Sequence, residues 1–189
     1  DEYSDKINCV IELSDGSVVA GGMRTYYSHS MPQYKGIIVR YQEDGEKIWE
    51  TTEGNEIKSV TETSDGNIIF GGTSNRYYSP GPAYLEGTLV GKISIDGETI
   101  WANSSNRVDG NYVYNPTIAY VYDVAEISTG EYIAVGKFSG KNFNIDSHTI
   151  ENHRYQGYSD DYYYDEGFII IYNNEGEIEN LIGVGGVKT

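Results

Sequence analysis

Residues 64–72 read SDGNIIFGG, which is a polar turn, a run of apolar residues and a pair of glycines. The same arrangement recurs at 14–22 as SDGSVVAGG and at 128–136 as STGEYIAVG. Glycine at the third position supplies the backbone freedom that a tight turn demands, and the apolar run that follows is typical of a strand. The stretch therefore predicts a β-hairpin that is repeated along the chain.

The similarity extends on both sides of this hairpin. Upstream, two apolar positions and a glutamate coincide in the three copies: Ile7, Ile57 and Val121; Val10, Val60 and Val124; Glu12, Glu62 and Glu126. Downstream, a second motif follows as GIIVRYQEDGEKIW at 36–49, TLVGKISIDGETIW at 88–101 and GFIIIYNNEGEIENL at 167–181. These coincidences indicate three repeats, at about 1–54, 55–110 and 111–189.

Each repeat is expected to form four antiparallel strands. In the first repeat we predict them at 7–13, 17–22, 36–42 and 46–51, with the Asp-Gly pairs forming two-residue hairpin turns. No segment shows a convincing helical period. Four-stranded antiparallel units of this length predict an all-β fold in which the repeats are the blades of a β-propeller, with the whole chain, 1–189, as a single propeller segment.

The positions of glycine, tyrosine and tryptophan resemble those of kelch repeats. They are Gly21-Gly22, Tyr41 and Trp49 in the first repeat, and Gly71-Gly72, Ile93 and Trp101 in the second. An Asp-Gly turn, a double glycine and then Asp-Gly-x-x-x-Trp is also similar to repeats of bacterial secreted and surface β-propellers. This resemblance implies a scaffold at the bacterial cell surface or outside the cell, and it implies no activity. The third repeat departs from the pattern at Val135 and Asn180.

Three repeats are fewer than the four to eight blades of a typical closed propeller. The chain starts at Asp1 without a methionine, and its last residues would run naturally into a start like its own. We therefore expect either a segment of a longer propeller, with further repeats in the same chain, or a ring that a second copy of this chain closes by self-association.

Composition excludes several classes of partner. The net charge of −16 comes from 29 acidic and 13 basic residues, and nucleic acids and anionic membranes require clustered basic residues. No apolar run is long enough to span a membrane. The single cysteine, Cys9, lies in an apolar strand, where we expect a buried and unreactive thiol.

Tyrosine is the most informative residue type for function. Of 19 tyrosines, 14 lie in the long connections 23–35, 73–87, 103–120 and 137–166, which should all emerge from one face because strand direction reverses at each turn. Tyrosine stacks on sugars and is favoured in protein recognition. We predict a non-catalytic binding or scaffold module that contacts glycan or protein through Tyr26, Tyr27, Tyr77, Tyr78, Tyr84, Tyr162, Tyr163 and Tyr164. The alternative is a purely structural propeller whose loops pack on one another.

No motif places catalytic residues, so a fragment of a carbohydrate-active hydrolase or oxidase is the weaker alternative, and no cofactor is expected. His29, His148 and His153 lie in loops without cysteine, which argues against zinc. Asp160, Asp161, Asp165 and Glu166 are weak candidates for binding Ca²⁺, although their spacing is not that of an EF-hand and a solvated loop is the other interpretation. The repeated Glu12, Glu62 and Glu126 could form a carboxylate ring open to a cation, or accept backbone N–H groups at the turns.

Overall fold

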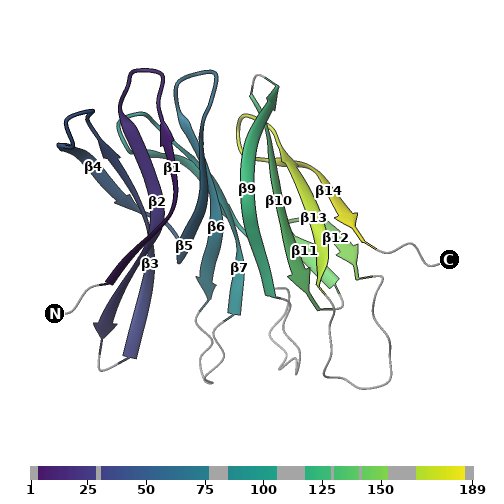
Figure 1. Ribbon diagram of the computed structural model, residues 1–189. Coiled ribbons are helices and arrows are strands. Elements are labelled where there is room, and N and C mark those ends of the chain that lie inside the picture. The colour runs from purple at the N-terminus through teal and green to yellow at the C-terminus, as the bar shows by residue number, and fades with distance from the viewer. Residues whose placement is uncertain are drawn as a thin grey trace.

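The repeats form three antiparallel sheets of four strands each, which stand side by side (Figure 1). The computed structural model describes residues 4–28, 31–76, 85–105, 118–128, 130–140, 142–152 and 165–185. The prediction of an all-β fold made of four-stranded antiparallel units is confirmed.

In each sheet the strands follow one another in chain order. The first sheet contains β1 (Ser4–Glu12), β2 (Val18–Ser28), β3 (Met31–Tyr41) and β4 (Lys47–Thr52). The second contains β5 (Glu56–Glu62), β6 (Ile68–Arg76), β7 (Leu85–Ile93) and β8 (Thr99–Ser104). The third contains β9 (Ile118–Ser128), β10 (Glu131–Ser139), β13 (Glu166–Tyr172) and β14 (Ile178–Val184), and a separate hairpin of β11 (Asn142–Ile145) and β12 (His148–Glu151) is inserted between β10 and β13.

The hairpin turns differ from the predicted two-residue form. In the first turn, the Gly16 amide donates to the Leu13 carbonyl, and the Leu13 amide donates to the Ser17 carbonyl. Only the glycine has a positive φ, of 84°. This is a type I turn followed by a glycine in the left-handed region, so the loop has three residues. The prediction that the Asp-Gly pairs form two-residue hairpin turns was therefore wrong.

The second glycine of each pair is required within its own sheet. A Cβ added at Gly22, Gly72 or Gly136 would lie 1.9 Å from a carbonyl oxygen of the neighbouring first strand. At this point the first strand carries a β-bulge, for example between Ile57 and Ser59 of β5. The bulge brings the two backbones so close that only glycine fits.

The core lies between successive sheets. One cluster joins the first two sheets and includes Val19, Ile38, Ile57, Val60 and Phe70, with Cys9 half-buried beside it. Burial raises the pKa of the Cys9 thiol, as expected for an unreactive cysteine. A second cluster joins the last two sheets and includes Ile69, Val90, Val121, Val124, Phe138, Phe143 and Phe168.

Two segments that were expected to be loops contain strands. β2 and β3 remain paired as far as Ser28 and Met31, well beyond the predicted end of the strand at residue 22. Within 137–166, the hairpin of β11 and β12 packs Phe143 against Phe168, with ring centroids 4.8 Å apart. Aromatic and β-branched residues in both segments favour strands, although they lack the turn signals used to locate the others.

The five tight turns at 13–17, 42–46, 63–67, 94–98 and 173–177 lie at one end of the molecule, the upper end in Figure 1, and we call it the short-turn end. Strands β2, β6 and β10 end, and β3, β7 and β9 begin, at the opposite end, which we call the long-connection end.

We predict that the two glycines of a pair differ in their tolerance of a side chain. Gly72→Ala should lower the free energy of unfolding by more than about 3 kcal/mol, because its Cβ would meet the Glu56 backbone. Gly71→Ala should cost about 1–3 kcal/mol, because its Cβ would meet only the side chains of Val121 and Val124. Urea unfolding measures both values, and equal losses would contradict the distinction.

Candidate functional site

Tryptophan joins each of the first two sheets to the next. Trp49 Nε1 donates to the Ile95 carbonyl at 2.9 Å, and Trp101 Nε1 donates to the Asn174 carbonyl at 3.1 Å. Each indole covers the glycine of that turn, since a Cβ added at Gly176 would lie 2.5 Å from the Trp101 ring. Both tryptophans therefore hold the turn between the third and fourth strands of the following sheet.

A buried cation stands at the same place in both interfaces. The Lys92 side chain is 3% exposed, and its Nζ donates to Asp65 at 2.7 Å, to the Tyr132 hydroxyl at 2.6 Å and to Asn174 at 3.0 Å. Arg40, the equivalent residue of the first sheet, is paired with Asp15 at 2.5 Å and donates to the Ile95 carbonyl at 2.7 Å. Each cation thus links the first turn of its own sheet to the next sheet.

These ion pairs shift the pKa of the groups involved. Burial alone would raise the pKa of Asp65, but hydrogen bonds from Lys92 and Thr63 outweigh it and hold this pKa well below its usual range. Burial alone would lower the pKa of Lys92, and its bond to Asp65 raises it instead. Shifted pKa values often mark active sites. Here the partners are residues of the same turn and of the facing sheet, so the cluster supports the turn and the contact between sheets.

Two of the three repeated glutamates accept hydrogen bonds from the turn of the preceding sheet. Glu62 accepts from the Ser14 amide at 2.8 Å and from its hydroxyl at 2.7 Å. Glu126 accepts from the Ser64 amide at 2.6 Å and from its hydroxyl at 2.9 Å. Among the described residues no group of three His, Cys, Asp or Glu could hold a metal ion. Of the two interpretations of these glutamates, the structure supports acceptance of turn N–H groups.

The described tyrosines of the predicted contact face lie on the paired extension of β2 and β3. Tyr27 is 64% exposed, and Lys35 places its Nζ 5.2 Å from the centre of the Tyr26 ring. Tyr26 pairs with Gln33 across the two strands, and Tyr27 pairs with Pro32. A regular two-stranded ribbon therefore carries this aromatic pair at the long-connection end (Figure 1).

A second aromatic group, which the sequence prediction missed in part, lies at the start of β9. The rings of Tyr120 and Tyr122 stack with an interplanar angle of 7° and centroids 6.4 Å apart. Lys137 Nζ lies 5.7 Å from the centre of the Tyr120 ring and forms an ion pair with Asp165 at 2.5 Å. Tyr122 occupies the bulge of its strand, a feature that the sequence pattern did not reveal.

Several predicted site residues lie outside the described residues, so the structure does not place them: Tyr77, Tyr78, Tyr84, Tyr162, Tyr163, Tyr164, Asp160, Asp161, His29 and His153. Of the calcium candidates that are described, Asp165 is paired with Lys137, and Glu166 is buried, with 2% of its surface exposed. These two carboxyl groups do not form an open calcium site.

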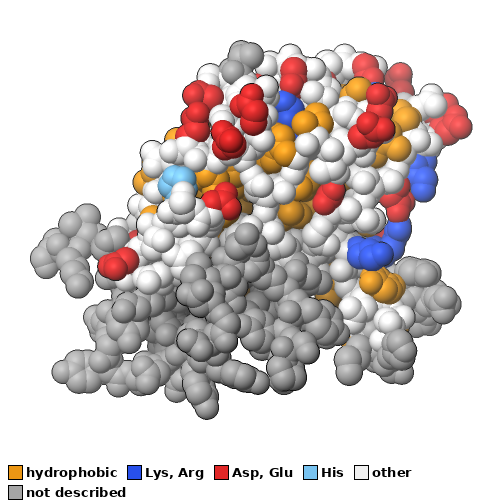
Figure 2. Space-filling view, turned by 180° about the vertical axis from the view of Figure 1, so that it is seen from behind, with side chains coloured by type: hydrophobic (Ala, Val, Ile, Leu, Met, Phe, Trp, Pro, Cys, Tyr) orange, Lys and Arg blue, Asp and Glu red, His pale blue; other side chains and the backbone are white. Residues whose placement is uncertain are grey.

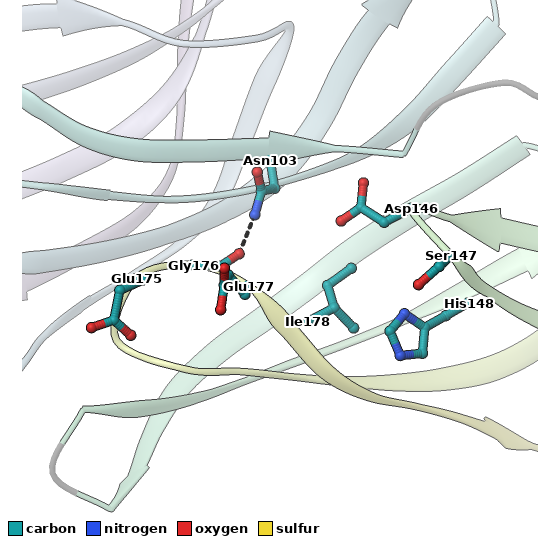
Figure 3. A pocket seen from close by; sticks show the side chains of 8 residues that line it. All are labelled: Asn103, Asp146, Ser147, His148, Glu175, Gly176, Glu177 and Ile178. Carbon is teal, nitrogen blue, oxygen red and sulfur yellow. Dashed lines mark hydrogen bonds between the residues drawn. The ribbon is translucent and has the colours of Figure 1, made fainter.

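One open pocket of about 450 Å³ lies between the second and third sheets (Figure 3). Asn103 spans it and donates to the Gly176 carbonyl, while Asp146 and His148 come from the hairpin of β11 and β12. His148 Nδ1 is buried and has no hydrogen-bond partner within the described part of the chain. Although Asp, Ser and His are adjacent at 146–148, no hydrogen bond joins these three described residues, so they form no catalytic triad.

Acidic side chains gather at the short-turn end (Figure 2). Exposed carboxylates of the turns produce this pattern: Glu43, Asp44, Asp96, Glu98, Glu175 and Glu177. This end therefore presents negative charge, whereas the tyrosine pairs 26/27 and 120/122 lie at or toward the other end.

No protein-family model matches the chain, and no curated protein matches it. Among the described residues, no helix is long and apolar enough to cross a membrane.

We predict that Asp65 and Lys92 are energetically coupled. Lys92→Ile and Asp65→Thr introduce the residues that the third repeat has at the equivalent positions, Ile171 and Thr129. Lys92→Ile alone should be destabilising, because it removes three donated bonds, and the double variant should lose about 1–2 kcal/mol less than the sum of the single variants. Urea unfolding of the four proteins measures this coupling, and additive losses would contradict it.

The same pair should give an acid-dependent contribution to stability. The pKa of Asp65 is lower in the folded protein, so its contribution is complete above the unfolded value of about 4 and is lost as the pH falls further. In Asp65→Thr, stability should therefore decrease less between about pH 5 and pH 2 than in the wild type.

Proposed function

We propose that the three sheets are consecutive blades of a β-propeller and that the chain is a non-catalytic binding or scaffold module. In this proposal it contacts glycan or protein through aromatic side chains at the long-connection end. The resemblance to bacterial surface propellers supports a location outside the cell or at its surface. The propeller arrangement is supported by the repetition of one interface, in which the same glycine, tryptophan, cation and glutamate positions join each sheet to the next.

The observation that carries the binding function is the exposed Tyr27 on the extension of β2 and β3, with Tyr26 on the opposite face of the same ribbon. Tyr27 leaves 64% of its surface exposed on a paired ribbon, where the backbone is already ordered. A rigid aromatic ring loses little conformational entropy on binding and offers a large apolar face. Lys35, beside Tyr26, adds a donor for hydroxyl or carboxylate groups.

The polar contacts that repeat between sheets lie away from this ribbon. The turns that bear Ser14 and Ser64, and those that bear Ile95 and Asn174, all belong to the short-turn end. Side chains at the long-connection end are therefore free of this part of the scaffold. Surfaces of this kind carry binding residues in many proteins with a rigid framework.

Tyr26→Ala/Tyr27→Ala is the variant that tests this function. Wild-type protein is applied to an array of immobilised glycans and used in pull-downs, and the affinity for the strongest glycan or protein partner is then measured by titration. We expect the dissociation constant to rise at least about tenfold in the variant, as for the loss of interface anchors. Tyr77→Ala/Tyr78→Ala tests the corresponding tyrosines of the second repeat.

Tyr41→Ala is the matched control, since Tyr41 is an exposed tyrosine at the other end of β3. It should leave the affinity unchanged, and all variants should melt within a few degrees of the wild type. Equal weakening by Tyr41→Ala and by the Tyr26/Tyr27 variant would contradict a contact face at the long-connection end. If wild-type protein retains neither glycan nor protein, the purely structural propeller is correct.

A further inference from the structure

Strand β1 exposes two large apolar side chains that the other repeats bury. Ile7 is 53% exposed and Val10 is 63% exposed. At the equivalent positions, Ile57 and Val60 of β5 are 0% and 3% exposed, because they pack on the first sheet. Val121 and Val124 of β9 are buried in the same way against the second sheet. Apolar side chains at these positions therefore serve contact with a preceding sheet wherever one is present.

The preceding sheet accommodates these side chains through the first glycine of its pair. A Cβ added at Gly21 would lie 2.7 Å from Ile57 Cγ2 and 3.2 Å from Val60 Cγ1. One added at Gly71 would lie 2.7 Å and 2.6 Å from the methyl groups of Val121 and Val124. The first glycine thus provides the space that the following strand fills.

The first sheet also retains the glutamate and the turn glycine with which the second and third sheets contact a preceding sheet. Glu12 occupies the position from which Glu62 and Glu126 accept the turn N–H of a preceding sheet. Gly45, with a φ of 89°, occupies the position of Gly97 and Gly176, which lie under Trp49 and Trp101. Around Gly45 a Cβ would meet nothing within 4 Å, so this turn has room for an indole.

The outer face of the third sheet lacks the residues with which the first and second sheets contact the sheet that follows them. Val135 replaces the first glycine, Ile171 replaces the buried cation, and Asn180 replaces the tryptophan. Head-to-tail packing of a second copy would place Val135 where the interfaces of this chain require glycine. The two outer faces of the molecule are therefore not complementary to each other.

We propose that the outer face of β1 is an interface for a further sheet of this repeat type, one that brings glycine, tryptophan and a basic residue to the positions of Gly21, Trp49 and Arg40. The proposal rests on the propeller arrangement proposed above, but not on the tyrosine contacts. It continues an interface that this chain forms twice.

An extended chain tests this interface. Residues 1–55 are duplicated in front of Lys6, so that Asn55 precedes Lys6 as it precedes Glu56 in the natural order. The melting temperature should rise by several degrees, and the amides of the original β1 should gain protection from hydrogen exchange. No gain in either would overturn the proposal.

Two variants show whether the gain comes from the proposed contact. Val10→Ser in the original first sheet should leave the melting temperature of the three-sheet chain unchanged, and should lower that of the extended chain by about 5 °C. Gly21→Val/Cys9→Ala in the added copy should remove the gain, and Cys9→Ala alone should keep it, because a Cβ at position 21 would otherwise meet Cys9 Sγ of the same sheet at 2.7 Å. An equal effect of Val10→Ser in both chains would contradict the inference.

The molecular mass of the protein in solution shows whether the outer face of β1 binds a second copy of this chain instead of a further sheet of the proposed kind. The wild-type chain should be a monomer in sedimentation at micromolar concentration. A dimer that Val10→Ser dissociates would show that the outer face of β1 binds another copy of the chain, and this would overturn the proposal. Because none of these measurements involves glycan or protein ligands, failure here is distinct from failure of the tyrosine contact face.

Discussion

The close approach of each first strand to the sheet before it determines the rest of this structure. A four-stranded sheet has two faces, and apolar residues on both must be covered. Gly21 and Gly71 have no side chain, so the strands bearing Ile57 and Val121 come within contact distance. Each buried valine or isoleucine contributes about 1.5–3 kcal/mol relative to an exposed one. This contact therefore provides much of the energy that keeps the sheets together.

The polar groups around this contact fix how the sheets align. A buried ion pair adds little net stability, because removing charges from water offsets their attraction. Lys92 nevertheless has three partners, contributed by its own sheet and by the next one. Trp101 and Glu126 add directional bonds at the same interface. An apolar surface alone would permit sliding, whereas these bonds are all made in one alignment.

The sequence predicted those features that depend on local patterns. The repeats, the antiparallel strands and the positive φ of the turn glycines all follow from residues close together in the chain. The turn type did not follow, because Asp-Gly suits both a two-residue turn and a type I turn with a left-handed glycine. The strand extension at Tyr26 and Tyr27 was missed because it lacks alternation of apolar and polar residues. The partner of Glu62 lies 48 residues away on another sheet, and no local pattern contains that information.

The positions of the repeated contacts explain where sequence variation is tolerated. The polar contacts that recur from one interface to the next involve the turns of the short-turn end, where a residue such as Ser14 or Asp65 has a partner on a neighbouring strand or sheet. Connections at the other end begin beyond Gly22, Gly72 and Gly136, the glycines that each bulge requires. From there the chain can lengthen, as it does to form the hairpin of β11 and β12, without altering the bulge or the turn contacts. Exposed aromatic residues such as Tyr27 can accumulate at this end at little cost to folding, which is the physical condition for a contact surface there.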